Sequence, residues 1–318
     1  MSRVTSPNLP NGSPNAGLAP RTLRSRRVRG ATLRGWVFLA PALIAYATFV
    51  LWPIAQTIRY SFYNWDGVAP AQWAGLANYK TVFTNGQLVS VIGHAFELIV
   101  FFSGIPVVLG LAIATVMRRF VTGRMSTVAR TILFLPQVVP LVAAGIAWSW
   151  LLSTTGAVDQ ILSGVGLGGW ARSWLGEFNT ALPAVGVIGA WVLLGLCTVL
   201  LFAGMAKIDP ALYEAAQLDG ANPFREFIAI TLPGLRQEIG ICVTVTMISA
   251  LSAFDIVYIA TQGGPGNATM VPGLEIYELA FFNRQVGLAS ALALVLMVLV
   301  IVCILPIQWF ARRGSVER

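Results

Sequence analysis

The sequence predicts an all-α fold, a polytopic membrane bundle of about six transmembrane helices with one structured loop on its cytoplasmic side. Hydrophobic residues make up 56% of the 318 residues and charged residues only 11%, whereas soluble domains carry roughly 25% charged residues. The apolar residues gather into six runs, each near the roughly 20 residues that cross a bilayer. The predicted spans are 35–60, 89–117, 127–152, 181–205, 237–260 and 286–310.

Residues 1–34 precede the first span and are rich in Pro, Ser, Asn and Arg. Six arginines gather just before the apolar run, namely Arg21, Arg24, Arg26, Arg27, Arg29 and Arg34. We expect a disordered cytoplasmic tail that lies on anionic headgroups, rather than a nucleic-acid-binding arm. The first run is longer than the apolar part of a signal peptide and shows no clear cleavage site, so we interpret it as a span. The chain thus divides into a tail, 1–34, and a transmembrane domain, 35–318.

Basic residues give the bundle its orientation. If the N-terminus lies inside, all but four of the 21 Lys and Arg residues fall in cytoplasmic segments. The four exceptions are Arg59, Lys80, Arg172 and Arg284. Because cytoplasmic loops carry an excess of Lys and Arg, both termini are predicted to be cytoplasmic. The segment between the fourth and fifth spans then lies on the same side.

That segment carries signals for two short helices joined by a bend. Asp209 and Pro210 form a helix start, since Asp caps free N–H groups and Pro suits the first helical position. Gly220 ends or bends the first helix. Asn222 and Pro223 repeat the start signal, and apolar residues follow at helical spacing. An interfacial hairpin that only links two spans would show the same physical pattern.

The residues of this segment closely resemble the EAA loop of permeases from binding-protein-dependent ABC importers. The motif positions are Glu214, Ala215, Ala216, Gly220, Ile230, Leu232 and Pro233. The resemblance implies that 206–236 is a coupling loop that docks in a cleft of a cytoplasmic ATPase, with Glu214 and Gly220 transmitting the closure of that ATPase. The residues implied to make this contact are Glu214, Ala215, Ala216, Asp219, Gly220, Asn222, Pro223, Phe224 and Pro233.

The same resemblance implies the other parts of a transporter. The phosphate-binding pattern GxxxxGK[ST] is absent from the sequence, so a cytoplasmic ATPase dimer must come from separate chains and bind ATP and Mg²⁺ itself. No cofactor is expected on this chain. The implied partners are that ATPase, a second homologous permease, an extracytoplasmic solute-binding protein and the lipid bilayer, without nucleic acid. The implied location is the cytoplasmic membrane of a prokaryote.

Two predicted outer loops resemble outer loops of sugar-importer permeases. Loop 61–87 contains Trp65 and a Gly-Leu-x-Asn-Tyr segment that ends at Tyr79, although an aromatic belt at the membrane interface would look similar. Loop 261–269 resembles the Gly-Gly-Pro loop that faces the binding protein, with a simple turn as the alternative. The residues predicted to contact a binding protein are Gly263, Gly264, Pro265, Asn267, Trp65 and Tyr79.

Polar residues inside the spans are candidates for a solute pathway, because a charge at mid-bilayer costs about 2.5–3.5 kcal/mol and should face a cavity or a partner. Four polar residues of the fifth span follow one another at i+3 spacing and give one broad stripe. With one aromatic residue of the fourth span, the predicted pathway residues are Asp255, Ser252, Ser249, Thr246 and Trp191. Helix–helix contact is an equal alternative for Thr246 and Ser249. A position near the outer rim stays open for Asp255.

The remaining reactive side chains are few. His94 and Glu97 lie three residues apart in the second span and could form a structural hydrogen bond, a pathway pair or a proton relay. The three cysteines all fall in apolar runs, so neither a metal site nor a disulfide framework is expected.

The favoured interpretation is the membrane subunit of an ATP-driven importer for a carbohydrate, such as an oligosaccharide or a similar polyol, that works by alternating access. Glycerol phosphate or a phosphodiester is an alternative cargo, but the only arginines near the pathway, Arg59, Arg172 and Arg284, lie toward the outer surface. An ion-coupled secondary transporter that uses Asp255 and Glu97 would leave the EAA-like loop unexplained. No nucleophile–base pair supports an enzyme.

Overall fold

The computed structural model describes residues 28–121 and 123–313, which fall into two compact units, Met1–Pro53 and Ile54–Arg318. The described part of the first unit is helical. It comprises α1 (Val28–Tyr46), the π-helical segment η1 (Ala47–Leu51) and the start of α2 (Trp52–Tyr60). Helix α1 begins before the span start predicted at residue 35, and residues 1–27 of the predicted tail lie outside the described residues.

The number of spans agrees with the prediction. Within the described ranges, four helices are long and apolar enough to cross a membrane, and two bent helix pairs bring the number to six. The four are Phe38–Tyr60, Gly86–Phe120, Ala181–Met205 and Val286–Ala311. The all-α membrane bundle is therefore confirmed, with one two-stranded hairpin among the described residues.

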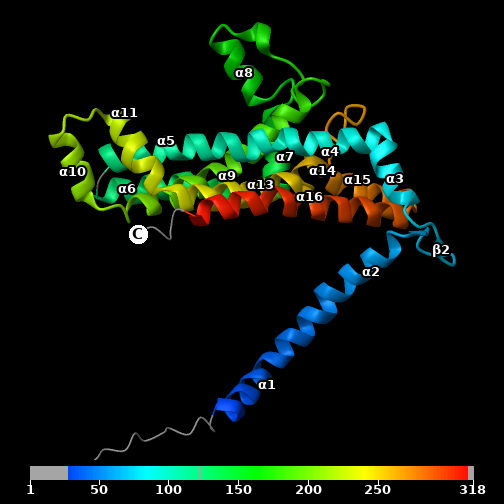
Figure 1. Ribbon diagram of the computed structural model, residues 1–318. Helices are drawn as coiled ribbons and strands as arrows, with labels where there is room; N and C mark the ends of the chain where they lie inside the picture. Colours follow the sequence, from blue (N-terminus) through cyan, green and yellow to red (C-terminus); the bar gives the residue numbers. More distant parts are fainter. Residues whose placement is uncertain (1–27, 122, 314–318) are drawn as a thin grey trace, which may run out of the picture. The chain divides into compact units, whose positions relative to one another are not determined.

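In the second unit, the end of α2 is followed by that hairpin and a long span (Figure 1). Strands β1 (Tyr63–Asn64) and β2 (Gln72–Trp73) pair antiparallel, with Tyr63 opposite Trp73. The elements that follow are α3 (Ala77–Thr84), α4 (Gly86–Ile99), the π-helical segment η2 (Val100–Gly104) and α5 (Ile105–Phe120). The last three form one continuous helix that Asn85 caps at its start, although Pro106 lacks an N–H and π-helical η2 lies directly before α5.

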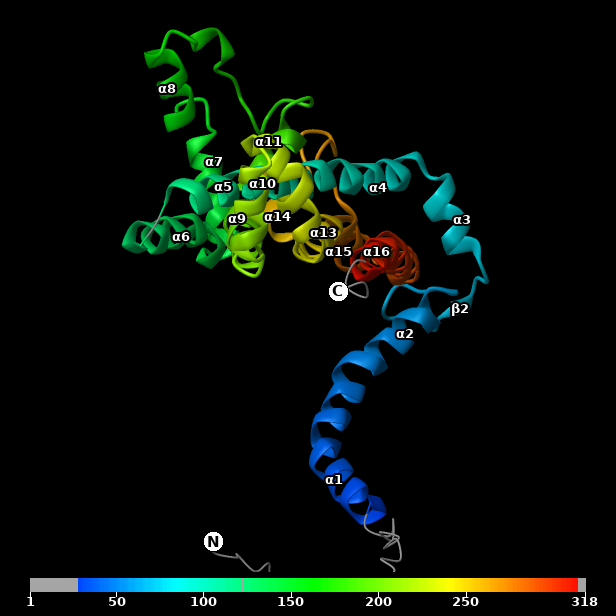
Figure 2. The ribbon, with the colours of Figure 1, turned by 60° about the vertical axis from the view of Figure 1, so that its left-hand side comes forward.

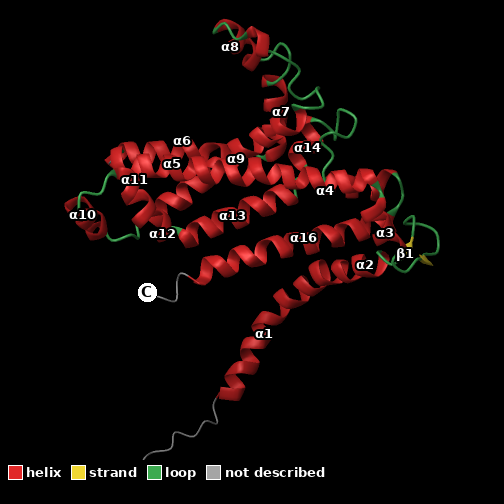
Figure 3. Ribbon diagram, turned by 45° about the horizontal axis from the view of Figure 1, so that its top comes forward, coloured by secondary structure: helices red, strands yellow, loops and turns green. Residues whose placement is uncertain are grey.

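The third span is broken, where the sequence predicted one helix over 127–152. Helix α6 (Gly123–Val138) and helix α7 (Leu141–Leu151) meet at an angle of 95°. Pro140 lies in the break with an extended ψ of 137°. Proline lacks an N–H and disfavours helical backbone in the preceding residue, so a helix ends there. Figure 3 shows α7 turning away from α6 toward α8 (Ala157–Gly164), which continues through η3 (Gly168–Trp170).

Helix α9 (Ala181–Met205) is the most buried of the four unbroken spans. Figure 2 shows it between α6 and α13. Glycines let the neighbours approach closely: Gly195 faces the backbone of Leu133 on α6, and Gly110 on α5 faces Cys197. Close approach of small residues is the usual basis of helix packing in membranes.

The fifth span is also broken, where the sequence predicted one helix over 237–260. The chain from α9 forms α10 (Pro210–Leu218), α11 (Pro223–Glu226), η4 (Phe227–Thr231), α12 (Leu232–Gly234), α13 (Arg236–Leu251) and α14 (Asp255–Ala260). Between α13 and α14 the backbone leaves the helical region at Phe254, whose ring stacks on Tyr258 and meets Tyr277 edge-on. Gly273 packs against the carbonyl of Ala253. Tertiary contacts hold this break, since Ser-Ala-Phe contains no helix-breaking residue.

The chain ends with α15 (Pro272–Tyr277), η5 (Glu278–Phe282) and the last span α16 (Val286–Arg313). Within the second unit, α10 and α11 lie at one end of the bundle and α3 lies at the other (Figure 1). Buried apolar side chains form one cluster around α9, α14 and α15, and a second around the ends of α5, α9 and α13 that lie near α10. The segment predicted to face the cytoplasm and the loops predicted to face outward are therefore separated along the bundle.

Candidate functional site

The predicted coupling segment begins with a capped helix. The Asp209 carboxylate accepts a hydrogen bond from the Ala211 N–H at 2.9 Å, and Pro210 occupies the first position of α10. The helix ends at Gly220, which has a φ of +74°. The N–H of Ala221 donates back to the carbonyl of Ala216 at 2.9 Å. This left-handed turn is the helix end that the sequence predicted.

The second helix of the segment covers Pro223–Gly234, as the apolar residues at helical spacing after Pro223 predicted. The Asn222 side chain accepts from the Arg225 N–H at 2.8 Å and starts α11, but the α-helix gives way to π-helical η4 at Phe227. Of the residues predicted to contact an ATPase, all are exposed except Ala216, which is half-buried. Leu218 and Phe224 expose 89% and 71% of their surface.

Polar and close contacts anchor the segment to the bundle at its two ends. The Lys207 ammonium lies 2.9 Å from a Glu238 carboxylate oxygen. Gly234 packs against Ile208, and Gly204 packs against Glu238 and Leu235. The two ends of the segment are thus held together, while the helices between them are exposed.

The polar stripe predicted on the fifth span is divided by its break. Thr246 is fully buried on α13 and donates to the Ser103 hydroxyl at 2.8 Å, so it is a helix–helix contact. Ser249 is the last residue of the stripe that still lies on α13. Ser252 lies in the break, and Asp255 begins α14. The predicted single stripe is therefore wrong, because its four members do not share one helix.

Three of the four nevertheless meet around one cavity of about 280 Å³. Ser249, Ser252 and Asp255 line it together with Gln137 of α6. The Gln137 Oε1 atom is buried and has no hydrogen-bond partner among the described residues. The other walls are mostly apolar: Phe102, Val139, Leu141, Gly189, Val192, Leu193, Ala253, Phe254 and Ile256. The cavity lies where both broken spans bend.

Sequence reasoning missed Gln137, although a lone amide inside an apolar run next to Pro136 was a usable signal. The predicted Trp191 does not line this cavity. Its ring meets Trp148 edge-on, with centroids 5.5 Å apart.

His94 serves a structural hydrogen bond. Its Nδ1 lies 2.8 Å from the carbonyl oxygen of Met270. Glu97 is exposed, and no hydrogen bond joins it to His94 in the part of the chain that the structure describes. Among the alternatives for this pair, the contact of His94 favours the structural one.

The Gly-Gly-Pro loop is ordered by its own hydrogen bonds. The Thr261 and Thr269 hydroxyls lie 2.7 Å apart, and the Thr269 hydroxyl also donates to the carbonyl of Gly264. Gly263 has a φ of +84° and is buried, whereas Gly264 and Pro265 are half-buried. Asn267 is exposed at the tip of the loop. Asn267 is thus the predicted contact residue that this loop presents most openly.

The first outer loop is held by the residues of its Asn-Tyr segment. The Asn78 side chain donates to the carbonyls of Ser61 and Tyr63, both at 2.9 Å. The Tyr79 hydroxyl lies 2.7 Å from that of Ser61. Trp65 stacks on Tyr60 at 4.1 Å. Both predicted contact residues, Trp65 and Tyr79, therefore also have internal structural roles.

Asp66 shapes the same loop. Its carboxylate accepts hydrogen bonds from the backbone N–H groups of Val68 at 2.9 Å and Ala69 at 2.8 Å. These bonds lower the pKa of Asp66 below its ordinary value, because they stabilise the ionised form.

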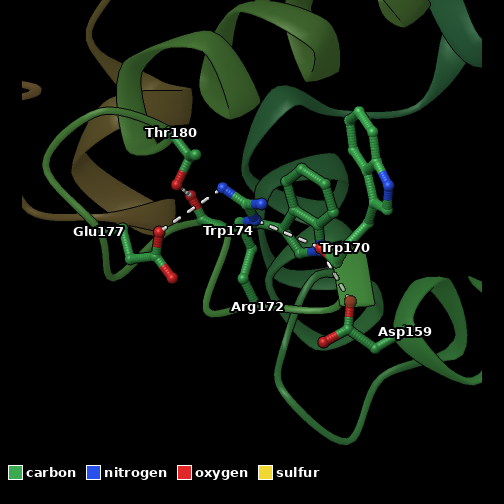
Figure 4. Close-up of polar contacts among 6 residues, drawn as sticks. All are labelled: Asp159, Trp170, Arg172, Trp174, Glu177 and Thr180. Atoms are coloured by element: carbon green, nitrogen blue, oxygen red, sulfur yellow. Dashed lines mark hydrogen bonds and ion pairs between the residues drawn. The ribbon is translucent and has the colours of Figure 1, made fainter. Parts of the chain in front are cut away.

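The arm between α7 and α9, which carries α8, was not singled out from the sequence (Figure 4). The buried Asp159 carboxylate accepts a hydrogen bond from the Trp174 Nε1–H at 2.7 Å. Thr180 donates to the Trp174 carbonyl, and Arg172 lies 4.0 Å from Glu177. The arm thus has a fixed conformation of its own.

Metal binding has no support within residues 28–121 and 123–313. That range contains no group of three His, Cys, Asp or Glu side chains able to hold a metal ion.

Comparisons with known proteins agree with this architecture. A family model described as "Binding-protein-dependent transport system inner membrane component" matches residues 104–315. The probable ABC transporter permease protein YurN of Bacillus subtilis is 31% identical over 293 residues, which are 89% of this chain and 97% of YurN. The diacetylchitobiose uptake system permease protein NgcF of Streptomyces coelicolor is 32% identical over 270 residues, which are 81% of this chain and 76% of NgcF.

The fold also matches a solved structure. A chain in the crystal structure of a bacterial alginate ABC transporter in complex with alginate pentasaccharide-bound periplasmic protein aligns with a TM-score of 0.73 and 24% identity. The alignment covers 90% of this chain and 98% of that chain. The family match spans the second half of the long second helix, both broken spans and the exposed helix pair. This chain therefore belongs to the family of inner-membrane components of binding-protein-dependent transport systems.

Proposed function

We propose that this chain is the transmembrane subunit of an ATP-driven importer that moves a carbohydrate across the cytoplasmic membrane of a prokaryote by alternating access. The main support is the exposed helix pair α10–α11 in a chain of a binding-protein-dependent transport family. NgcF is named for diacetylchitobiose uptake, and the periplasmic protein in the similar structure holds an alginate pentasaccharide. Both are carbohydrates, so the proposed cargo is an oligosaccharide or a similar polyol.

The proposed partner of α10–α11 is a cytoplasmic ATPase dimer that binds ATP and Mg²⁺. The exposed side chains of Leu218 and Phe224 favour a protein partner, because large apolar groups exposed at a polar face commonly mark an interface. Phe224 also lines a hollow of about 360 Å³ with Gly220, Asn222 and Arg225. The exposed Glu214 carboxylate and the turn at Gly220 are proposed to receive the movement of the ATPase.

A second, homologous permease is proposed to complete the pathway. Both termini are proposed to lie in the cytoplasm, which the excess of basic residues in the predicted inner segments supports. The domain division stays as proposed: a basic cytoplasmic tail, 1–34, and a permease domain, 35–318. On the outer side, Asn267 and Pro265 of the Gly-Gly-Pro loop, with Trp65 and Tyr79, are proposed to face the solute-binding protein.

The cavity between the broken spans suits a polyhydroxy solute. Its amide, two hydroxyls and one carboxylate can donate to and accept from sugar hydroxyls, while the apolar walls can lie against ring carbons. No Lys or Arg is among the described residues that line it. A phosphate-bearing cargo would need such cations, and the relatives described above give that alternative no support.

Purification of the tagged full chain from its native membranes in gentle detergent tests the assembly. We expect mass spectrometry to recover an ATPase and a second six-span chain. The co-purified binding protein would then be tested against diacetylchitobiose, alginate oligosaccharides and glycerol phosphate. Recovery of this chain alone, under conditions that keep a control ABC complex intact, would overturn the proposed function.

Two variants test the role of the helix pair in the assembled complex. Glu214→Lys and Gly220→Asp should leave the chain inserted in the membrane but abolish ATP-driven uptake. Unchanged uptake in both would refute the coupling role. The matched control is Arg124→Gln, which changes an exposed charge on α6 outside the predicted coupling loop 206–236.

A further inference from the structure

Helix α10 has few close neighbours within the bundle. No other helix of the described chain runs along it. Instead, a cavity of about 630 Å³ separates α10 and α11 from the inner end of α5, with Phe120, Gln217 and Phe227 among its lining residues. Any direct contact between α10 and α5 must therefore be made by side chains that meet at the edge of this cavity.

Tyr213 of α10 makes two such contacts. The Arg118 guanidinium at the end of α5 lies 3.5 Å from the centre of the Tyr213 ring, well within the roughly 6 Å of a cation–π interaction. The Tyr213 hydroxyl lies 3.0 Å from the hydroxyl of Thr231, which is buried at the end of η4. One side chain thus touches both the second span and the entry to the fifth.

The second span continues from this contact to the candidate pathway. Helix α5 is part of the unbroken helix Gly86–Phe120. Within that helix, Phe102 lines the cavity between the broken spans, and Ser103 accepts the hydrogen bond of Thr246. A displacement applied at Arg118 would therefore act along one continuous helix on residues that shape the cavity.

We propose that Tyr213, held by Arg118 and Thr231, transmits movement of α10 to the second and fifth spans. Tyr213 and Arg118 are positioning residues, and the inference rests on the proposed function because it assumes that an ATPase moves α10. The peptide chain joins α10 only to α9 and α11, so the Arg118–Tyr213 contact supplies the direct path to α5.

The test uses the complete ATPase–permease complex in lipid nanodiscs and needs no identified cargo. A reporter, Ser252→Cys, is placed in the cavity and Cys303 is replaced by Ala, leaving Cys197 and Cys242, which are buried. The measured quantities are the rate of ATP hydrolysis and the change in maleimide labelling of the reporter when ATP and vanadate are added.

Tyr213→Leu and Arg118→Gln should reduce the nucleotide-dependent change in labelling by about fivefold or more, while ATP hydrolysis continues. Tyr213→Phe keeps the ring but loses the hydroxyl, so we expect a loss of about two- to tenfold. The double variant Tyr213→Leu/Arg118→Gln should lose no more of the labelling change than Tyr213→Leu alone, because both substitutions remove the same contact. Arg119→Gln is the matched control, since Arg119 also lines the cavity but its guanidinium lies over the ring of Phe120, 5.8 Å from the ring centre.

A wild-type response in assembled Tyr213→Leu and Arg118→Gln complexes would overturn the inference and leave the proposed function intact. An equal loss in Arg119→Gln would also overturn it, because the effect would then follow charge alone. If Tyr213→Leu does not assemble, Arg118→Gln and Tyr213→Phe decide the question. A wild-type complex that shows no nucleotide-dependent change would instead refute the proposed function.

Discussion

Replacing Gly220 by Ala, Asn and Asp separates the turn that this residue makes from the surface that it presents. Gly220 has a φ of +74°, and a Cβ at this position would meet no atom of the chain within 4 Å. Strain within the chain is therefore confined to the backbone. Left-handed backbone costs Ala about 1–2 kcal/mol, whereas Asn and Asp adopt it more readily.

Amide hydrogen exchange measures how stable the turn at residue 220 is. The N–H of residue 220 donates to the Gln217 carbonyl at 3.1 Å, and the Ala221 N–H donates to the Ala216 carbonyl at 2.9 Å. A cost of about 1–2 kcal/mol corresponds to about five- to thirtyfold faster exchange in Gly220→Ala. Exchange in the Asn and Asp variants should stay close to that of the wild type.

Transport per ATP hydrolysed reports on the surface that residue 220 presents to the ATPase. It should rank the three variants differently from amide exchange. An unpaired carboxylate buried in an interface costs about 3–5 kcal/mol, so Gly220→Asp should lose at least tenfold in coupling. Gly220→Ala adds one methyl group and should lose little. If instead transport follows the exchange rates, with Ala the worst and Asp unaffected, Gly220 acts only as a turn residue and the docking argument is wrong.

Three further changes test the bundle. Thr246→Val leaves the buried Ser103 hydroxyl without its donor and should cost about 1–3 kcal/mol of stability in a detergent unfolding titration, with Thr246→Ser as control. Asp159→Ala removes the acceptor of the Trp174 Nε1–H. Proteolysis of the arm between α7 and α9 should then increase by about five- to thirtyfold, while proteolysis of the bundle stays unchanged. If the arm is cleaved at the same rate in the variant and the wild type, the role given to this bond is wrong. Burial raises the pKa of Glu275, outside the six spans, above its ordinary value of 4.5, so the folded chain holds this proton more tightly than the unfolded chain. Thermal stability should therefore fall as pH rises from 4.5 through the raised pKa, and Glu275→Gln should remove that part of the slope.

The sequence predicted the parts of the fold that depend on local chemistry. Caps at Asp209 and Asn222 and the turn at Gly220 appear where expected, since each satisfies backbone groups within a few residues. The break at Pro140 was predictable from the same chemistry, but the long apolar run concealed it. An apolar run indicates transfer into lipid and says little about straightness.

The break at Phe254 was not predictable from local sequence. It depends on Gly273 and Tyr277, which come some twenty residues later and pack against it. This break also explains why the predicted polar stripe failed and why the cavity was only partly foreseen. Gln137 reaches that cavity from another span, and contacts between distant segments leave no periodicity in either one.

The two broken spans divide the molecule into bodies that could move as separate pieces. Helix α7 packs against α14 through Gly145 and Ile259, whereas α6 packs against α9 through Leu133 and Gly195. The joints between these bodies, at Val139 and at Ser252–Phe254, both line the same cavity. A small rotation at the two joints would therefore change the volume and shape of the cavity without bending any helix. The proposed pathway would then open and close at hinges that the folded chain already contains.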